Sequence, residues 1–196
     1  MARGFAAVHP YQEERLRSVG VRDQQVSQGY GYARLSAGSH KPVGEMDGRR
    51  YGYAIDLSAS YAPTRAHFNA LAAAGFAPFW RDWSGNEHWH IVDLAWIKDD
   101  AGKVRGHNGV LRGQVASFLA TPARDGLRSN RRLSSAWTPT KSQQRFLRDI
   151  FENGHPVTQE PTLVKVIRKS TGEVVTTHRM VPGGDHVCDQ RKLYVE

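Results

Sequence analysis

The sequence predicts an α+β fold in which a small antiparallel sheet is flanked by helices, followed by a small C-terminal αββ unit. Three observations support this expectation. An apolar helical stripe ends at Gly75, several β-type runs are separated by short polar turns, and a hairpin pattern lies near the C-terminus. A chain of 196 residues is long enough for one compact domain with a small appended unit.

The first 120 residues contain the expected elements of the larger domain. In chain order these are a helix at 10–20, a strand at 51–57, a helix at 65–74, strands at 76–80 and 88–97, and a helix at 110–119. Pro10 and Gly20 stand at the start and the end of the first helix, where proline and glycine are favoured. In the helix at 65–74, Phe68 and Leu71 recur at helical spacing before Gly75.

The chain changes character after residue 100. The segment 121–135 is polar and basic, as in a linker. A helix is expected at 141–153, where the apolar residues fall on one face, and the β-type runs 162–169 and 173–180 flank a turn at 170–172. We therefore predict a domain over 1–120, a basic linker over 121–135 and an αββ unit over 136–196.

Composition narrows the classes of function. No run approaches the roughly 20 apolar residues of a membrane helix, and the N-terminus lacks an apolar signal core, so we expect a protein made in the cytoplasm and not inserted in a membrane. A single cysteine, Cys188, excludes an internal disulfide framework. The net charge of +8 predicts attraction to polyanions. Nucleic acid is the weaker choice among these, because no nucleic-acid recognition motif is present.

The histidines are the natural place to look for a metal site, because zinc without cysteine is bound by histidine and carboxylate. His40 precedes a polar loop at 41–50, and Asp56 ends a predicted strand. His88 and His90 alternate along another strand, so both can face the same side of the sheet. Two strands and a loop can thus bring His, Asp and His together around one ion.

Glu87 is a candidate general base beside such an ion. Strand periodicity alone would point positions 87 and 90 to opposite faces, so Glu87 must belong to the turn at 82–86 for its carboxylate to reach the site. This is a geometric condition that a structure can test.

The runs Ser39-His40, Gly52-Tyr-Ala-Ile-Asp56 and Glu87-His-Trp-His90 resemble the zinc D-alanyl-D-alanine carboxypeptidase and dipeptidase family. That family belongs with lysostaphin and the hedgehog signalling domain in one superfamily. The resemblance covers about residues 28–97. It implies Zn²⁺ as the cofactor, and it implies the following roles: zinc ligands His40, Asp56 and His90, general base Glu87, and substrate-binding Arg34.

The chain departs from the family pattern at two places. Fifteen residues separate His40 from Asp56, where the family has six, so we interpret 41–50 as an inserted loop and keep Asp47 as the alternative ligand. The upstream arginine segment also matches poorly. The competitors of Arg34 are Arg22, Arg49 and Arg50.

The resemblance implies a metallopeptidase that hydrolyses a D,D or L,D bond in the peptide stem of peptidoglycan. A phage endolysin is one natural setting, and such an enzyme reaches the wall by a separate export or lysis route. The basic C-terminal half is expected to contact anionic wall polymers. The rival hypothesis is a non-catalytic protein of the same fold that binds cell wall or nucleic acid. We expect His88 to support the ligands from outside the metal's coordination shell and the remaining histidines to be structural: His9, His67, His107, His155, His178 and His186.

Overall fold

The computed structural model describes residues 2–32, 38–83, 85–120, 139–153, 162–168, 171, 174–180 and 192–195. The chain divides into two compact units, Met1–Val157 and Thr158–Glu196. The first unit combines helices with antiparallel strands, which confirms the predicted α+β class. Among the described helices, none has both the length and the apolar character needed to cross a membrane.

The centre of the first unit is a four-stranded antiparallel sheet with the strand order β1-β4-β6-β5. Its strands are β1 (Val26–Gln28), β4 (Ala54–Ser58), β5 (Phe76–Trp83) and β6 (Asn86–Asp93). In this register His90 of β6 lies opposite Asp56 of β4 on one side and Phe79 of β5 on the other. The β5–β6 hairpin is longer than predicted, since its strands extend to Trp83 and from Asn86.

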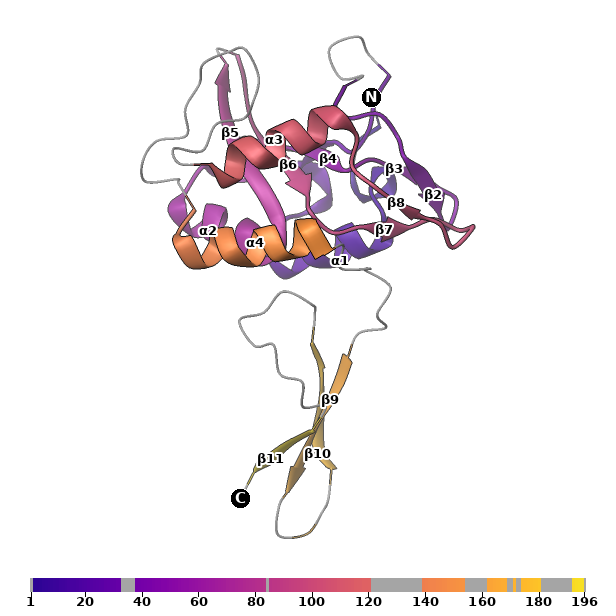
Figure 1. Cartoon of the computed structure of the whole chain (residues 1–196), viewed down its shortest axis with the longest axis vertical. Coiled ribbons are helices and arrows are strands. Elements are labelled where there is room, and N and C mark those ends of the chain that lie inside the picture. The colour runs from indigo at the N-terminus through magenta and orange to yellow at the C-terminus, as the bar shows by residue number, and fades with distance from the viewer. Residues whose placement is uncertain are drawn as a thin grey trace. The chain divides into compact units, whose positions relative to one another are not determined.

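Four α-helices accompany the sheet: α1 (Pro10–Ser18), α2 (Arg65–Ala73), α3 (Gly109–Leu119) and α4 (Lys141–Asn153). Three of them have a side-chain cap that accepts a backbone N–H of the first turn. The caps are His9 for α1, Thr64 for α2 and Asn108 for α3. Helix α2 contacts β5, α3 contacts β6, and α4 contacts both α2 and α3 (Figure 1). Two short 3₁₀ helices, Phe5–Ala7 and Asp23–Gln25, precede β1.

One hydrophobic core holds these helices and strands together. Its largest fully buried side chains include Trp89 of β6, Phe68 of α2, Phe79 of β5 and Phe118 of α3. The ring of Phe118 meets that of Phe79 edge to face at a centroid distance of 5.4 Å. Helix α3 is thereby packed over the face of the sheet that carries Phe79 and His90.

Two small hairpins stand outside the central sheet. The segment predicted as an inserted loop forms one of them, with β2 (Gly44–Met46) and β3 (Arg49–Tyr51) joined at Asp47 and Gly48. Both joining residues have positive φ, 52° and 71°, as a tight two-residue hairpin turn requires. The other hairpin pairs β7 (Ile97–Lys98) with β8 (Val104–Arg105).

The boundary between the units lies later than the sequence suggested. We predicted that the helix at 141–153 belongs with the C-terminal strands, but α4 buries Leu147 and Ile150 in the core of the first unit. The second unit contains β9 (Thr162–Arg168), β10 (Val174–Met180) and β11 (Lys192–Val195). Strand β9 pairs antiparallel with β10, as the hairpin pattern predicted, and parallel with β11. The predicted linker at 121–135 lies outside the described residues.

Candidate metal centre

The fold brings together the three residues predicted to bind a metal. Asp56 and His90 are register partners on β4 and β6, and His40 approaches from the segment before β2. Oδ1 of Asp56 lies 2.8 Å from Nδ1 of His90 and 3.2 Å from Nε2 of His40. One ligand atom from each residue lies within 4.8 Å of the others, so the group could hold a metal ion. Ligands of a tetrahedral zinc ion, each about 2.0–2.1 Å from it, would themselves be about 3.3 Å apart, which is close to these separations.

The hydrogen bond behind His40 fixes how its ring faces the site. Nδ1 of His40 lies 3.0 Å from the carbonyl oxygen of Ala54, and a carbonyl only accepts, so Nδ1 carries the proton. In the neutral ring Nε2 therefore has a lone pair, and this buried atom has no hydrogen-bond partner among the described residues. It faces Oδ1 of Asp56, which is also electron-rich. A cation between these two atoms, either a proton on Nε2 or a metal ion, removes the repulsion, so the donor set can accept a metal.

The protonation states of the group also suit a cation. Burial raises the pKa of Asp56, but hydrogen bonds and electrostatic attraction from His40 and His90, when these rings carry a proton toward the carboxylate, outweigh burial and hold that pKa below its usual range. Burial and the nearby charge of Arg81 lower the pKa of His90 to about 4, although the hydrogen bond to Asp56 opposes them. At neutral pH the group therefore consists of a carboxylate and a neutral His90, which are the metal-binding forms.

His88 approaches the other oxygen of the same carboxylate. Nδ1 of His88 donates to the carbonyl oxygen of Asn86 at 2.6 Å, so the other ring nitrogen, Nε2, faces away from that carbonyl. That Nε2 lies 3.9 Å from Oδ2 of Asp56. Asp56, whose side chain is 14% exposed, is thus surrounded by three imidazole rings, two at one oxygen and one at the other.

Glu87 does not meet the geometric condition set by its predicted role. It lies inside β6, paired with Asp82, and not in the turn. Its exposed carboxylate accepts the backbone N–H of Gly85 at 3.2 Å. Strand alternation places Glu87 on the face opposite to His88 and His90. The physical reason is that the hairpin continues its pairing two residues further than the turn signals indicated.

The other predicted site residues lie elsewhere. Asp47, the alternative ligand, is exposed in the β2–β3 turn, and its N–H donates to Asp100. Arg49 pairs with Glu13, and Arg50 contacts Tyr32 and Glu45. Arg22 is exposed beside the second 3₁₀ helix, and Arg34 lies outside the described residues.

Sequence reasoning missed two buried polar residues at the site. Gln114 of α3 places Oε1 3.2 Å from Nε2 of His90. Arg81 of β5 is the register partner of His88, and its positive charge lowers the pKa of His90. A usable signal existed for Gln114, because it interrupts the otherwise apolar inner stripe of its helix.

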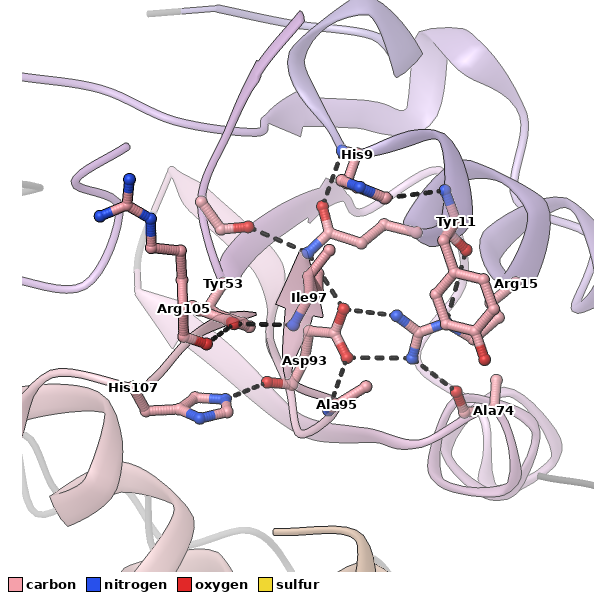
Figure 2. Close-up of polar contacts among 12 residues, drawn as sticks. His9, Tyr11, Arg15, Tyr53, Ala74, Asp93, Ala95, Ile97, Arg105 and His107 are labelled. Atoms are coloured by element: carbon pink, nitrogen blue, oxygen red, sulfur yellow. Dashed lines mark hydrogen bonds and ion pairs between the residues drawn. The ribbon is translucent and has the colours of Figure 1, made fainter. Parts of the chain in front are cut away.

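A buried polar network holds the end of β6 that follows His90 (Figure 2). Asp93 accepts from Arg15 through both carboxylate oxygens, and Gln12 of the same helix donates to it at 3.0 Å. The backbone N–H of Ala95 and the ring of His107 complete the network around Asp93. Helix α1 and the end of β6 are therefore fixed together, which limits movement of the strand that carries His90.

Comparison with family models, curated proteins and solved structures finds no match to the chain.

Proposed function

We propose that this protein is a zinc-dependent peptidase that hydrolyses a D,D or L,D bond in the peptide stem of peptidoglycan. The observation that carries the proposal is the electron-rich group formed by Nε2 of His40 and Oδ1 of Asp56, completed by His90. Two imidazoles and one carboxylate without a thiolate are a ligand set typical of catalytic zinc, which keeps a further coordination position open. The sequence resemblance and the net charge of +8 support the choice of an anionic wall substrate.

The chain's own residues supply the remaining chemistry. Zinc at this site would provide Lewis-acid activation of water and of the scissile carbonyl. His88 is a candidate to take a proton, because its Nε2 lies 3.9 Å from Oδ2 of Asp56, beside the site. Glu87, the base expected from the sequence, would have to leave its present contact with Gly85 to reach the same position. His88 and Glu87 are therefore competing assignments of the base.

Metal content is the first test of the proposal. Wild-type protein loaded with zinc and then desalted should retain one equivalent by mass spectrometry of the metal. Asp56→Ala and His90→Ala should lose it, because each removes a ligand from the group. Asp47→Ala is the matched control, since Asp47 is exposed in a distant turn and should leave the content unchanged. Wild-type protein that retains no zinc would overturn the proposal.

Substitution of the two candidate bases separates the assignments. We expect His88→Gln to keep zinc and to lose about 10²–10⁴-fold in the rate of cleavage of a stem peptide ending in D-alanyl-D-alanine. Glu87→Gln should cleave at nearly the wild-type rate. The reverse pattern would assign the base to Glu87 and would require the start of β6 to open. If wild-type protein holds zinc and cleaves no stem peptide, the rival hypothesis of a binding protein is favoured.

A further inference from the structure

Helix α3 places a buried carboxamide against the candidate metal centre. Gln114 is only 2% exposed, and its neighbours on the inner face of the helix are the apolar residues Leu111, Val115 and Phe118. A polar group in such surroundings is costly unless it is hydrogen-bonded. Its Oε1 lies 3.2 Å from Nε2 of His90, while its own Nε2 has no partner among the described residues.

The ring of His90 consequently lies between two oxygens. Oδ1 of Asp56 is 2.8 Å from Nδ1, and Oε1 of Gln114 is 3.2 Å from Nε2. A metal-binding imidazole is neutral and has only one N–H, so it can donate to only one of these oxygens. If the proton is on Nε2 and points to Gln114, then Nδ1 presents its lone pair to the side where His40 and Asp56 meet.

We propose that Gln114 is a positioning residue that selects Nδ1 of His90 as the metal ligand by accepting the proton of its Nε2. The inference rests on the proposed metal site. It predicts that the two histidines bind through different nitrogens, His40 through Nε2 and His90 through Nδ1. The carbonyl of Ala54 plays the same part for His40: it accepts the proton of Nδ1 and leaves Nε2 to bind the metal.

A carboxamide suits this position because it can serve the site with and without metal. With the ion bound, Oε1 accepts from Nε2–H of His90. Without the ion, Nδ1–H can donate to Asp56, and rotation of the carboxamide by 180° then turns its amide N–H toward the free Nε2 of His90. A carboxylate could accept only, and an aliphatic side chain could do neither.

Contacts at both ends of α3 hold Gln114 beside His90. Asn108 caps α3 and donates through Nδ2 to the carbonyl oxygen of Gly38 at 3.0 Å, two residues before His40. At the other end of the helix, Phe118 packs against Phe79, which lies opposite His90 in the sheet. Helix α3 thus links the segment that carries His40 to the strands around His90, with Gln114 between these two anchors.

The test combines zinc affinity with the position of the His90 proton. Affinity is measured by competition with a chromophoric chelator, and two-bond ¹⁵N–¹H correlation spectra of zinc-loaded protein identify the protonated nitrogen. We expect Nε2–H on His90 in wild-type protein and its conversion to Nδ1–H when zinc is removed. Gln114→Leu should bind zinc about 10–100-fold more weakly, whereas Gln114→Glu, which can still accept, should retain the affinity and the Nε2 proton. Gln143→Leu on α4 is the matched control and should change neither.

The outcomes separate this inference from the proposed function. Wild-type protein that binds no zinc overturns the proposed function and removes the premise of the inference. Wild-type protein that binds zinc with Nδ1–H on His90, or Gln114→Leu with unchanged zinc affinity, overturns the role of Gln114 alone. A general loss of folding in Gln114→Leu would appear as lost dispersion of amide resonances, whereas Gln114→Glu tests the same hydrogen bond with an acceptor in place.

Discussion

At the scale of single residues, the site is organised around one carboxylate. Asp56 lies close to three imidazole nitrogens, and the orientation of the rings of His40 and His88 is set by hydrogen bonds from Nδ1 to backbone carbonyls. Nε2 of His40 consequently faces Oδ1 of Asp56, and Nε2 of His88 lies 3.9 Å from Oδ2. The arrangement is suited to a cation, because ligand atoms of His40, Asp56 and His90 lie within 4.8 Å of one another.

The pKa of His90 makes the stability of metal-free protein depend on pH. Burial lowers this pKa to about 4 in the folded chain from its ordinary value of 6.5, so between these two values the unfolded state binds more protons. The free energy of unfolding should therefore fall as the pH falls from about 6.5 to about 4, by about 3 kcal/mol from this group. Urea unfolding at several pH values, in the presence of a chelator, measures this fall in the free energy of unfolding.

His90→Gln is the control for this pH dependence. The variant keeps a polar side chain that can bond to Asp56 and lacks the titrating ring. Its stability should vary less over the same pH range than that of wild-type protein. An equal slope for both proteins would show that His90 does not carry the effect.

The grouping of His40, Asp56 and His90 could be predicted from the sequence, whereas the position of Glu87 relative to that group could not. Apolar residues flank Asp56 and not Asp47, and these flanks place Asp56 in the central sheet beside His90. Glu87 lies on the face of β6 opposite to His88 and His90 because the strand already begins at Asn86, so position 87 follows strand alternation and does not belong to the turn. Gln114 escaped prediction because its partner is distant in sequence and reached only through packing of α3.

At the scale of elements, local patterns predicted which segments are helical but not where they pack. Helix α2 has its predicted apolar face and ends before Gly75, whose φ of 84° suits a helix C-terminus. The apolar face of α4 was also visible in the sequence, yet its partners in α2 and α3 were not. The sequence of an amphipathic helix shows that its apolar face must be buried, but it does not show which surface of the protein buries that face.

The buried pair between α1 and β6 should dominate the stability of that contact. Arg15 and Asp93 are almost completely buried, so Arg15→Met leaves a carboxylate without its main counter-charge. We expect a loss of about 3–5 kcal/mol in the free energy of unfolding, measured with urea. Arg17→Met on the same helix is the matched control. Its pair with Glu13 is solvent-exposed and should contribute at most about 1 kcal/mol. Equal losses in the two variants would contradict a structural role for the buried pair.

At the scale of the whole molecule, the candidate metal centre belongs entirely to the first unit. His40, Asp56 and His90 all lie within Met1–Val157, and so do the helices that contribute to its core. The second unit, Thr158–Glu196, forms its own three-stranded sheet. The structure therefore assigns α4 to the unit that contains the candidate metal centre, and the position of the boundary can be tested by truncation.

A chain that ends at Val157 should keep the fold and the metal, whereas a chain that ends at residue 138 should lose stability. The longer form retains α4, which buries Leu147 and Ile150 in the core of the first unit. Each buried aliphatic side chain contributes about 1.5–3 kcal/mol, so removal of α4 should cost about 3–6 kcal/mol. Urea unfolding and zinc content of both truncated chains are compared with those of the full chain. Equal stability of the two truncated chains would place α4 outside the core, as the boundary near residue 135 had implied. If the form ending at Val157 were itself unstable, the second unit would be necessary for the fold of the first.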